Sequence, residues 1–326
     1  MIDTYGRKID YLRISVTDRC NLRCRYCMPA AGIDNKGHSR ILSLEQIARL
    51  AKIGSETGVS HVRLTGGEPL VRKNIVSLVE KITSLPGIKD VSMTTNGVLF
   101  PAMADQLKQA GLTRVNISLD TLNPSKYHYI TRSGQLGDAI PAVHKALELN
   151  MNPVKINVVV IKGFNDDEIL DFADLAYKQP VNIRFIEFMP IGDLDFHTSD
   201  KCLSVSAVRK IIEQKYELDE DAEVKGYGPA KYAKPQGGQG CLGFISAMSD
   251  HFCGGCNRIR MTADGKLRGC LYNSSEIDLR LALYNDCSDE QLRSLFLKAI
   301  LMKPEQHHMS EGWGQENQRK MYQIGG

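Results

Sequence analysis

Short runs of β-branched and apolar residues alternate with helical patterns over the first two-thirds of the chain. The runs predict six strands, at residues 11–16, 61–65, 90–95, 114–119, 154–161 and 181–188. Helices are predicted between and after them, at residues 43–57, 73–84, 101–110, 138–150, 166–178 and 204–216. Six βα units in series imply parallel strands with right-handed crossovers. The pattern therefore predicts an α/β fold, and by itself it fits an open sheet as well as a barrel.

The predicted strands carry a polar face as well as an apolar one. Side chains alternate across a strand, so Leu12 and Ile14 can pack on the helices while Arg13 points the other way. Four basic residues fall on this second face: Arg13, Arg63, Lys155 and Arg184. Buried cations cannot pack together without a counter-charge, so an anionic ligand is expected among them. An antiparallel sheet with one solvated face would give the same alternation, but the intervening helices make it the weaker interpretation.

The pattern changes after residue 216. Residues 226–240 are rich in glycine, proline and lysine and predict a long loop. Asp264-Gly265 predicts a hairpin turn between strands at 257–262 and 266–270. Two further elements are predicted, a strand at 243–248 and an amphipathic helix at 289–301. We therefore expect two parts, an α/β unit over 1–216 and an α+β extension over 217–326.

The composition is typical of a globular protein rather than a membrane or nucleic-acid-binding one. The chain has 326 residues, of which 42% are hydrophobic and 24% charged, and no apolar run approaches the ~20 residues that span a bilayer. The 41 basic and 38 acidic residues give a net charge of +3, which argues against a broad surface for nucleic acid. The N-terminal residues lack the apolar core of a signal peptide, so a cytoplasmic protein without membrane or nucleic-acid partners is expected.

The chain contains nine cysteines, which is many for a reducing compartment, where disulfides are disfavoured. Two groups have metal-ligand spacing, C-x3-C-x2-C and C-x2-C-x13-C: Cys20, Cys24 and Cys27, and Cys253, Cys256 and Cys270. The other three are expected to be small buried side chains: Cys202, Cys241 and Cys287. Metal or redox chemistry is therefore expected at the two groups.

Each group offers three thiolates, which suits an iron–sulfur cluster with one open iron. The first group follows the first predicted strand and lies at the C-terminal edge of the sheet, where active sites of such folds lie. A structural zinc site normally has four ligands, and no fourth cysteine or histidine stands nearby in the sequence. In the second group, the predicted hairpin folds Cys270 back toward Cys253 and Cys256. We therefore interpret both groups as [4Fe–4S] sites.

Two motifs at consecutive strand ends resemble the radical S-adenosylmethionine (SAM) superfamily. Residues 18–27, DRCNLRCRYC, are similar to its cysteine signature, and residues 65–69, TGGEP, are similar to its GGEP segment. The resemblance implies reductive cleavage of SAM to methionine and a 5′-deoxyadenosyl radical, with the cofactor carrying that chemistry. It also implies four SAM contacts: Tyr26, Gly67, Ser118 and Met189.

Further segments resemble one family within this superfamily, the GTP 3′,8-cyclases of molybdenum-cofactor synthesis. They are residues 3–7, 12–17, 228–230, 243–246, 253–260 and 325–326, so the resemblance covers nearly the whole chain. It implies an incomplete (βα)6 TIM-type barrel whose open side is covered by the C-terminal extension. The implied reaction converts GTP to (8S)-3′,8-cyclo-7,8-dihydroguanosine 5′-triphosphate, the first step of molybdenum-cofactor synthesis.

The same resemblance implies substrate contacts and a catalytic tail. Seven GTP contacts are implied: Arg13, Arg63, Thr94, Lys155, Arg184, Arg258 and Arg260. Catalytic roles are implied for Arg13 and for the terminal Gly325 and Gly326, which have no side chains and can thread a crowded channel. Some family members have lysine where this chain has His61, and the role of that histidine stays open.

The resemblance also implies partners, and two alternatives remain. The expected partners are GTP, the downstream cyclic pyranopterin monophosphate synthase and a reductase or flavodoxin-type electron donor, and a homodimer is compatible with the sequence. One alternative is a radical SAM enzyme that modifies a peptide or protein, although such enzymes carry more auxiliary cysteines. The other is a zinc-bearing nucleic-acid-binding protein, which predicts basic runs and stacking aromatics, whereas this chain has one tryptophan.

Overall fold

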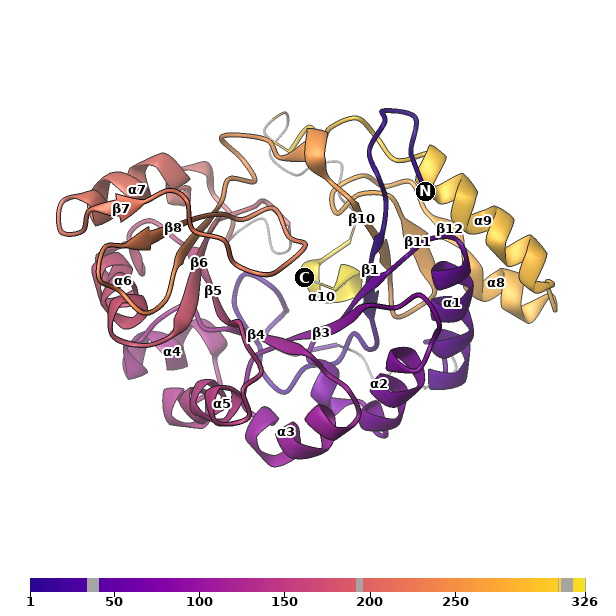
Figure 1. Cartoon of the computed structure of the whole chain (residues 1–326), viewed down its shortest axis with the longest axis horizontal. Helices are drawn as coiled ribbons and strands as arrows, with labels where there is room; N and C mark the ends of the chain where they lie inside the picture. Colours follow the sequence, from indigo (N-terminus) through magenta and orange to yellow (C-terminus); the bar gives the residue numbers. More distant parts are fainter. Residues whose placement is uncertain (34–40, 192–195, 310, 312–318, 326) are drawn as a thin grey trace.

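The computed structural model describes residues 1–33, 41–191, 196–309, 311 and 319–325. Six strands, β1 to β6, form its centre: Tyr11–Ser15, His61–Thr65, Asp90–Thr95, Arg114–Ser118, Val154–Val160 and Val181–Glu187. Each pairs in parallel with the next in chain order, as the sequence predicted. Figure 1 shows these strands curving around a central space, with helices on the outside.

Seven helices, α1 to α7, cover the outer face of these strands: Leu44–Glu56, Ile75–Thr83, Phe100–Gln109, Pro124–Thr131, Leu136–Glu148, Ile169–Lys178 and Val205–Glu213. Local sequence sets several of their ends. Ser43 forms a capping box with Gln46 at the start of α1, and Gly58 takes a φ of 101° just beyond its end. The sequence pattern missed the short helix α4, although Asn123 accepts hydrogen bonds at its N-terminus and Pro124 occupies its first turn.

The C-terminal part extends the sheet at both edges. Its elements are β7 to β12 and α8 to α10: Leu218–Asp219, Lys231–Pro235, Leu242–Ile245, Arg258–Met261, Lys266–Arg268, Ile277–Asp278, Leu279–Tyr284, Asp289–Leu301 and Met321–Ile324. Strand β10 pairs in parallel with β1, and β9 pairs in parallel with β6. The strand order is β12-β11-β10-β1-β2-β3-β4-β5-β6-β9-β8-β7, and the two end strands, both described, do not pair. The incomplete TIM-type barrel is therefore confirmed, while the division at residue 216 stays a prediction.

Details of the extension differ from the sequence-based expectation. Residues 226–240 are not all loop, because β8 lies within them and pairs antiparallel with β9 through Tyr232 and Gly243. The hairpin turn is confirmed, since the Gly265 amide donates to the Thr262 carbonyl at 2.9 Å and Gly265 takes a φ of 81°. The short helix α10 was not predicted, because four residues carry too little periodicity to detect.

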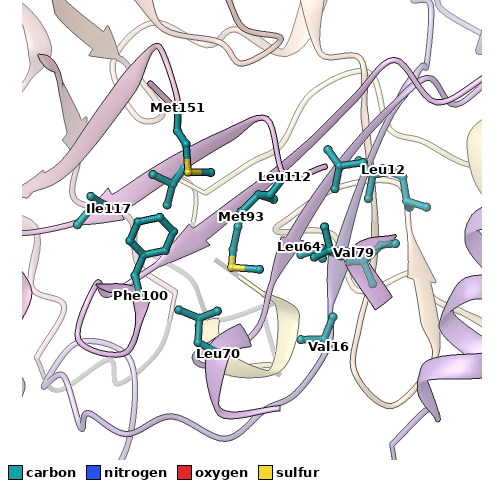
Figure 2. Packing of buried hydrophobic residues seen from close by; sticks show 14 of the residues in the cluster. Leu12, Val16, Leu64, Leu70, Val79, Met93, Phe100, Leu112, Ile117 and Met151 are labelled. Carbon is teal, nitrogen blue, oxygen red and sulfur yellow. The ribbon is translucent and has the colours of Figure 1, made fainter. Parts of the chain in front are cut away.

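The hydrophobic core lies between the outer face of the sheet and the helices. Leu12, Leu64, Met93 and Ile117 are fully buried there, and Figure 2 shows them with Phe100 of α3 in the same cluster. Because this side takes the apolar residues, the alternate residues of each strand face the barrel interior. Among the described residues, no helix combines the length and apolar character that crossing a membrane requires.

Candidate active site

A cavity of about 290 Å³ occupies the barrel interior. Both cysteine groups line it, as do most of the predicted substrate contacts: Cys20, Cys24, Cys27, Cys253, Cys256, Cys270, Arg13, Arg63, Thr94, Arg184, Arg258 and Arg260. The predicted SAM contacts also line it: Tyr26, Gly67, Ser118 and Met189. Lys155 is not among the lining residues, and its Nζ donates to the Lys225 carbonyl at 2.6 Å. The fold thus brings residues that are far apart in the sequence into one chamber.

The first cysteine group lies in the loop after β1, which is held against the end of α4. The Arg23 amide donates to the Thr131 carbonyl at 3.0 Å. Arg132 has a φ of 64° and donates to the carbonyls of Arg23 and Met28, at 2.8 Å each. The helix that the sequence pattern missed therefore shapes the cysteine loop.

The three thiols of this loop fit a metal cluster. Burial raises the pKa of Cys20 to about 11 and that of Cys27 to about 12. Burial, followed by the charges of its neighbours, raises the pKa of Cys24 well above its usual value. None of the three forms a disulfide. Such thiols ionise when a metal supplies the compensating charge, and three of them with an open iron position suit a [4Fe–4S] cluster.

The TGGEP segment after β2 packs directly on the cysteine loop. A Cβ at Gly66 would lie 2.5 Å from the Thr17 carbonyl oxygen, and one at Gly67 would lie 2.4 Å from the Arg19 carbonyl oxygen. The Gly67 amide donates to the Thr17 carbonyl at 2.8 Å. The close approach of these two loops therefore requires glycine here, a reason that the sequence did not reveal. Contact between Gly67 and SAM stays a prediction.

Tyr26 is oriented by an acidic residue that the sequence reasoning missed. Its hydroxyl donates to Oδ2 of Asp120 at 2.7 Å, and its ring meets Phe188 edge-on with 6.4 Å between centroids. Asp120 also accepts from the Val159 amide at 2.9 Å, and burial raises its pKa to about 6. Asp120 lies two residues after Ser118, so alternation continued past the end of β4 would have pointed to it.

The N-terminal segment holds the second cysteine group. Cys253 lies on a short 3-10 helix, and Cys270 follows β11. The guanidinium of Arg7 donates to the carbonyls of Cys253 at 2.9 Å and Glu305 at 2.7 Å. Asp3 pairs with Arg7 at 2.6 Å, and both side chains are buried. This buried ion pair therefore anchors the loop that carries the second group.

Cys256 differs electrostatically from the cysteines of the first group. Its Sγ accepts hydrogen bonds from Nζ of Lys303 at 3.3 Å and from Nη2 of Arg258 at 3.5 Å. Burial opposes ionisation, but the charges of Arg258 and Lys303 lower the pKa of Cys256 to about 6. This group therefore presents one thiolate at neutral pH, which suits a metal ligand. The sequence reasoning missed Lys303, which lies 47 residues from Cys256 along the chain.

Two histidines lie beside Cys253, and no sequence pattern indicates that they would meet. The ligand atoms of His251, Cys253 and His307 all lie within 4.8 Å of one another, the spacing of a metal site. Burial, followed by the charge of His251, lowers the pKa of His307 to about 4. Cys253 thus belongs to two candidate donor sets, and iron and zinc analysis of the purified protein distinguishes them.

The three isolated cysteines lie away from the cavity: Cys202, Cys241 and Cys287. They are half-buried, so the expectation that they would be small buried side chains is only partly right. The thiol of Cys202 donates to the Phe188 carbonyl at 3.0 Å. All three are free thiols, and Cys202 packs against the same small hydrophobic cluster as Tyr26 of the first cysteine loop.

Basic residues gather in the barrel interior, as the strand alternation predicted. Burial is the main cause that lowers their pKa values: that of Arg13 falls well below its usual value, that of Arg63 to about 10 and that of Arg260 to about 9. Burial, followed by the charge of Arg184, lowers the pKa of Lys155 to about 6. Both causes disfavour the charged form, and an anion bound among these groups would offset them.

Two further side chains extend this basic region, and the sequence left both unassigned. Arg114 forms a buried ion pair with Asp90, and its Nη1 has no hydrogen-bond partner among the described residues. His61 lies against Tyr227 with 3.4 Å between ring centroids, and burial lowers its pKa. Alternation along β4 from Asn116 would have pointed to Arg114.

The C-terminal tail, which follows α10 in the chain, lies inside the barrel. Gly325 takes a φ of 82°, and a Cβ there would lie 2.4 Å from Oγ1 of Thr65. Its carbonyl is hydrogen-bonded to Arg260, and Figure 1 shows α10, which directly precedes Gly325, in the central space. Gly326 lies outside the described residues. The tail therefore reaches predicted substrate residues, and its catalytic role stays a prediction.

Comparison with known proteins agrees with this arrangement. The profile of the Radical SAM superfamily matches residues 14–176, and that of Molybdenum Cofactor Synthesis C matches residues 181–309. The structure of Streptococcus suis SuiB bound to S-adenosylmethionine aligns with a TM-score of 0.59 at 16% identity, covering 97% of this chain and 77% of that one. That likeness shows the fold alone. Together with the profile match, the fold and the three-cysteine loop after β1 define a radical SAM enzyme.

Curated relatives identify one family within the radical SAM enzymes. The GTP 3′,8-cyclase of Syntrophomonas wolfei is 57% identical over 326 residues, and that of Moorella thermoacetica is 51% identical over 326 residues. Each alignment covers 100% of both chains. This chain belongs to the GTP 3′,8-cyclase family. Membership favours a cyclase over the peptide-modifying and nucleic-acid-binding alternatives.

Proposed function

We propose that this chain converts GTP to (8S)-3′,8-cyclo-7,8-dihydroguanosine 5′-triphosphate, the first step of molybdenum-cofactor synthesis. The observation that carries the proposal is the single cavity lined by both cysteine groups and by inward-facing basic residues. The relatives are named GTP 3′,8-cyclases, and this name indicates GTP as the substrate. Two [4Fe–4S] clusters and SAM, when bound, supply the electron and the radical chemistry. The residues of the chain bind, orient and shield the reactants.

We assign the first cysteine group to the cluster that binds SAM. Its ligands are Cys20, Cys24 and Cys27, whose buried thiols need a metal in order to ionise. Tyr26 lies beside them, and its hydrogen bond to Asp120 fixes the ring that supports the adenine. Gly67, Ser118 and Met189 complete the SAM contacts, and all of them line the same cavity.

We assign the second group, Cys253, Cys256 and Cys270, to a cluster that faces GTP. Arg258 and Arg260 lie on β10 next to this group and line the cavity. Arg13 occupies the facing position on β1, where it is the register partner of Arg260, and we assign it a catalytic role. Thr94 also lines the cavity, and its buried hydroxyl has no hydrogen-bond partner among the described residues. These groups are placed to orient the nucleoside.

The triphosphate is assigned to Arg63, Lys155 and Arg184. Charge-assisted hydrogen bonds to phosphate are strong, and the arginine fork can bind two oxygens. Arg114 adjoins this set, because its charge acts on Lys155. The segment at Gly226 closes over the same region, since a Cβ there would lie 2.5 Å from Nζ of Lys155. Arg63, Lys155 and Arg184 are all buried, so the phosphate region is shielded from bulk water.

The protein partners follow from family resemblance. We infer that the product passes to cyclic pyranopterin monophosphate synthase and that a reductase or flavodoxin-type protein supplies electrons. A cytoplasmic location, which the polar N-terminal residues predict, and a homodimer are also proposals. No broad excess of basic charge supports a nucleic-acid partner, since the net charge is +3.

Anaerobic turnover tests the proposed function. Reconstituted protein with SAM and dithionite is incubated with GTP, ATP, CTP or UTP, and 5′-deoxyadenosine and cyclised nucleotide are quantified. Cyclised product is expected with GTP alone and is expected to disappear in the Cys24→Ala variant. Equal turnover of all four nucleotides, or product formation by the Cys24→Ala variant, would contradict the proposal.

A further inference from the structure

We propose that Lys303 is a positioning residue of the second cysteine site, where its ammonium group raises the reduction potential of the bound cluster through Cys256. The inference rests on the proposed function, because it takes Cys253, Cys256 and Cys270 as cluster ligands. The relevant residues are all described by the structure, and Lys303 also lines the cavity.

The ammonium group of Lys303 is held in one position by three acceptors. Its Nζ donates to the Arg258 carbonyl at 2.9 Å, to the Gly269 carbonyl at 2.7 Å and to Sγ of Cys256 at 3.3 Å. A lysine ammonium has three donors, so these contacts use all of them. Lys303 directly follows the C-terminal cap of α9 at Met302, which fixes the direction of its approach.

The charge of Lys303 requires a negative partner. The residue is only 3% exposed, and a buried cation is strongly unfavourable unless it is paired. Among the residues that the structure describes, Lys303 forms no ion pair with a carboxylate within 4.0 Å. Two of its acceptors are neutral carbonyls. The compensating negative charge therefore lies on the sulfur of Cys256 and on the cluster that this sulfur binds.

Among the residues that the structure describes, no lysine or arginine side chain donates a hydrogen bond to a sulfur of the first cysteine group. The hydrogen bonds to Sγ of Cys20 come from neutral donors, the Leu22 amide at 3.4 Å and Nδ2 of Asn96 at 3.7 Å. Charge and hydrogen bonds at the sulfurs set the potential of an iron–sulfur cluster. A fixed cation favours the reduced form, which carries one more negative charge. The second cluster is therefore expected to accept an electron more readily than it would without Lys303.

Redox titration of reconstituted full-length protein tests this role. The Cys24→Ala background leaves the second cluster as the one to be titrated, and the measurement is repeated in the two-cluster enzyme. In Lys303→Met, the ratio of reduced to oxidised second cluster at a fixed solution potential should fall at least about tenfold, which is about 59 mV for one electron. Lys303→Gln, which keeps a polar group, should behave alike, whereas Lys303→Arg should stay within about threefold of the parent.

Lys298→Met is the matched control, because Lys298 lies on α9 and is exposed. It should leave the ratio unchanged. If both neutral variants bind iron and keep the parent ratio, the role of Lys303 is structural and the inference is wrong, while the proposed function stands. If the Cys24→Ala parent itself holds no iron at the second group, both the inference and the assignment of that cluster are wrong.

Discussion

The guanidinium Nη1 of Arg260 donates a hydrogen bond to the carbonyl of Gly325 at 3.0 Å. Arg260 lies on β10 inside the barrel, whereas Gly325 lies at the other end of the extension, 65 residues later. The contact places the end of the chain among the cations assigned to GTP. A flexible tail is ordered only when its contacts offset about 1–2 kcal/mol of backbone entropy per residue, so this hydrogen bond indicates a specific position.

Gly325→Ala should disturb this tail without affecting cluster assembly. Alanine disfavours the φ of 82°, and its Cβ would lie 2.4 Å from Oγ1 of Thr65. We expect wild-type iron content and at least about tenfold less cyclised product, equivalent to about 1.4 kcal/mol in the barrier. Deletion of Gly325 and Gly326 should have the same or a larger effect.

The matched control for the tail is Gly137→Ala. Gly137 lies in the first turn of α5, and a Cβ there would have no neighbour within 4 Å. Iron content and product formation should equal those of the parent. Normal product formation by the truncated enzyme would show that the tail has no catalytic role.

The two cysteine groups should bind iron independently. Replacing Cys24 or Cys256 by alanine should leave about half of the iron of an enzyme with two [4Fe–4S] clusters. The Cys24→Ala variant should lose SAM cleavage, whereas the Cys256→Ala variant should keep the first cluster and lose productive turnover of GTP. Cys241→Ala is the control, since Cys241 does not line the cavity, and it should keep all the iron. Full iron in either ligand variant would exclude its group as a cluster site.

Arg7→Met should destabilise the second cysteine site from a distance. Removing Arg7 leaves Asp3 buried and unpaired, and breaking a buried ion pair in this way costs about 3–5 kcal/mol. It also removes the donors that hold the carbonyls of Cys253 and Glu305. We expect a lower Tm and selective loss of iron from the second group. Lys8→Met is the control, since the Lys8 side chain is 76% exposed, and equal Tm values for the two variants would contradict the anchoring role.

The alternation of apolar and polar residues along the strands was the basis for most of the fold prediction and for part of the predicted site. The parallel strands and the inward position of Arg63 and Arg184 follow from it directly, because each strand must present one face to the helices. Contacts such as Lys303 with Cys256, or His251 with His307, could not be predicted in this way. They depend on where separate loops meet after folding, and no local sequence pattern indicates the relative position of distant loops.

Recognition of the triphosphate should depend on the basic residues of the interior. Replacing Arg63 by methionine removes a charge-assisted contact in a buried site, so GTP affinity should fall by about 1–3 kcal/mol, or roughly 5- to 150-fold in Kd. Guanosine should bind much more weakly than GTP, and its affinity should change little in the variant. Isothermal titration measures both, with Lys178→Met as the control because the Lys178 side chain is 70% exposed. Equal affinity for GTP and guanosine would refute the assignment.

Lys155 makes the same binding depend on pH. In the free enzyme its pKa is lowered to about 6, first by burial and then by the charge of Arg184, so the amine is largely neutral at pH 7. A bound triphosphate stabilises the ammonium form and raises the pKa of Lys155. At any pH between the pKa of the free enzyme and that of the complex, GTP binding is therefore accompanied by uptake of a proton. GTP affinity should therefore fall as pH rises above about 6, and titration in buffers of different ionisation enthalpy should detect the proton uptake. Lys155→Met should abolish that uptake, and an unchanged uptake in the variant would show that another group takes up the proton.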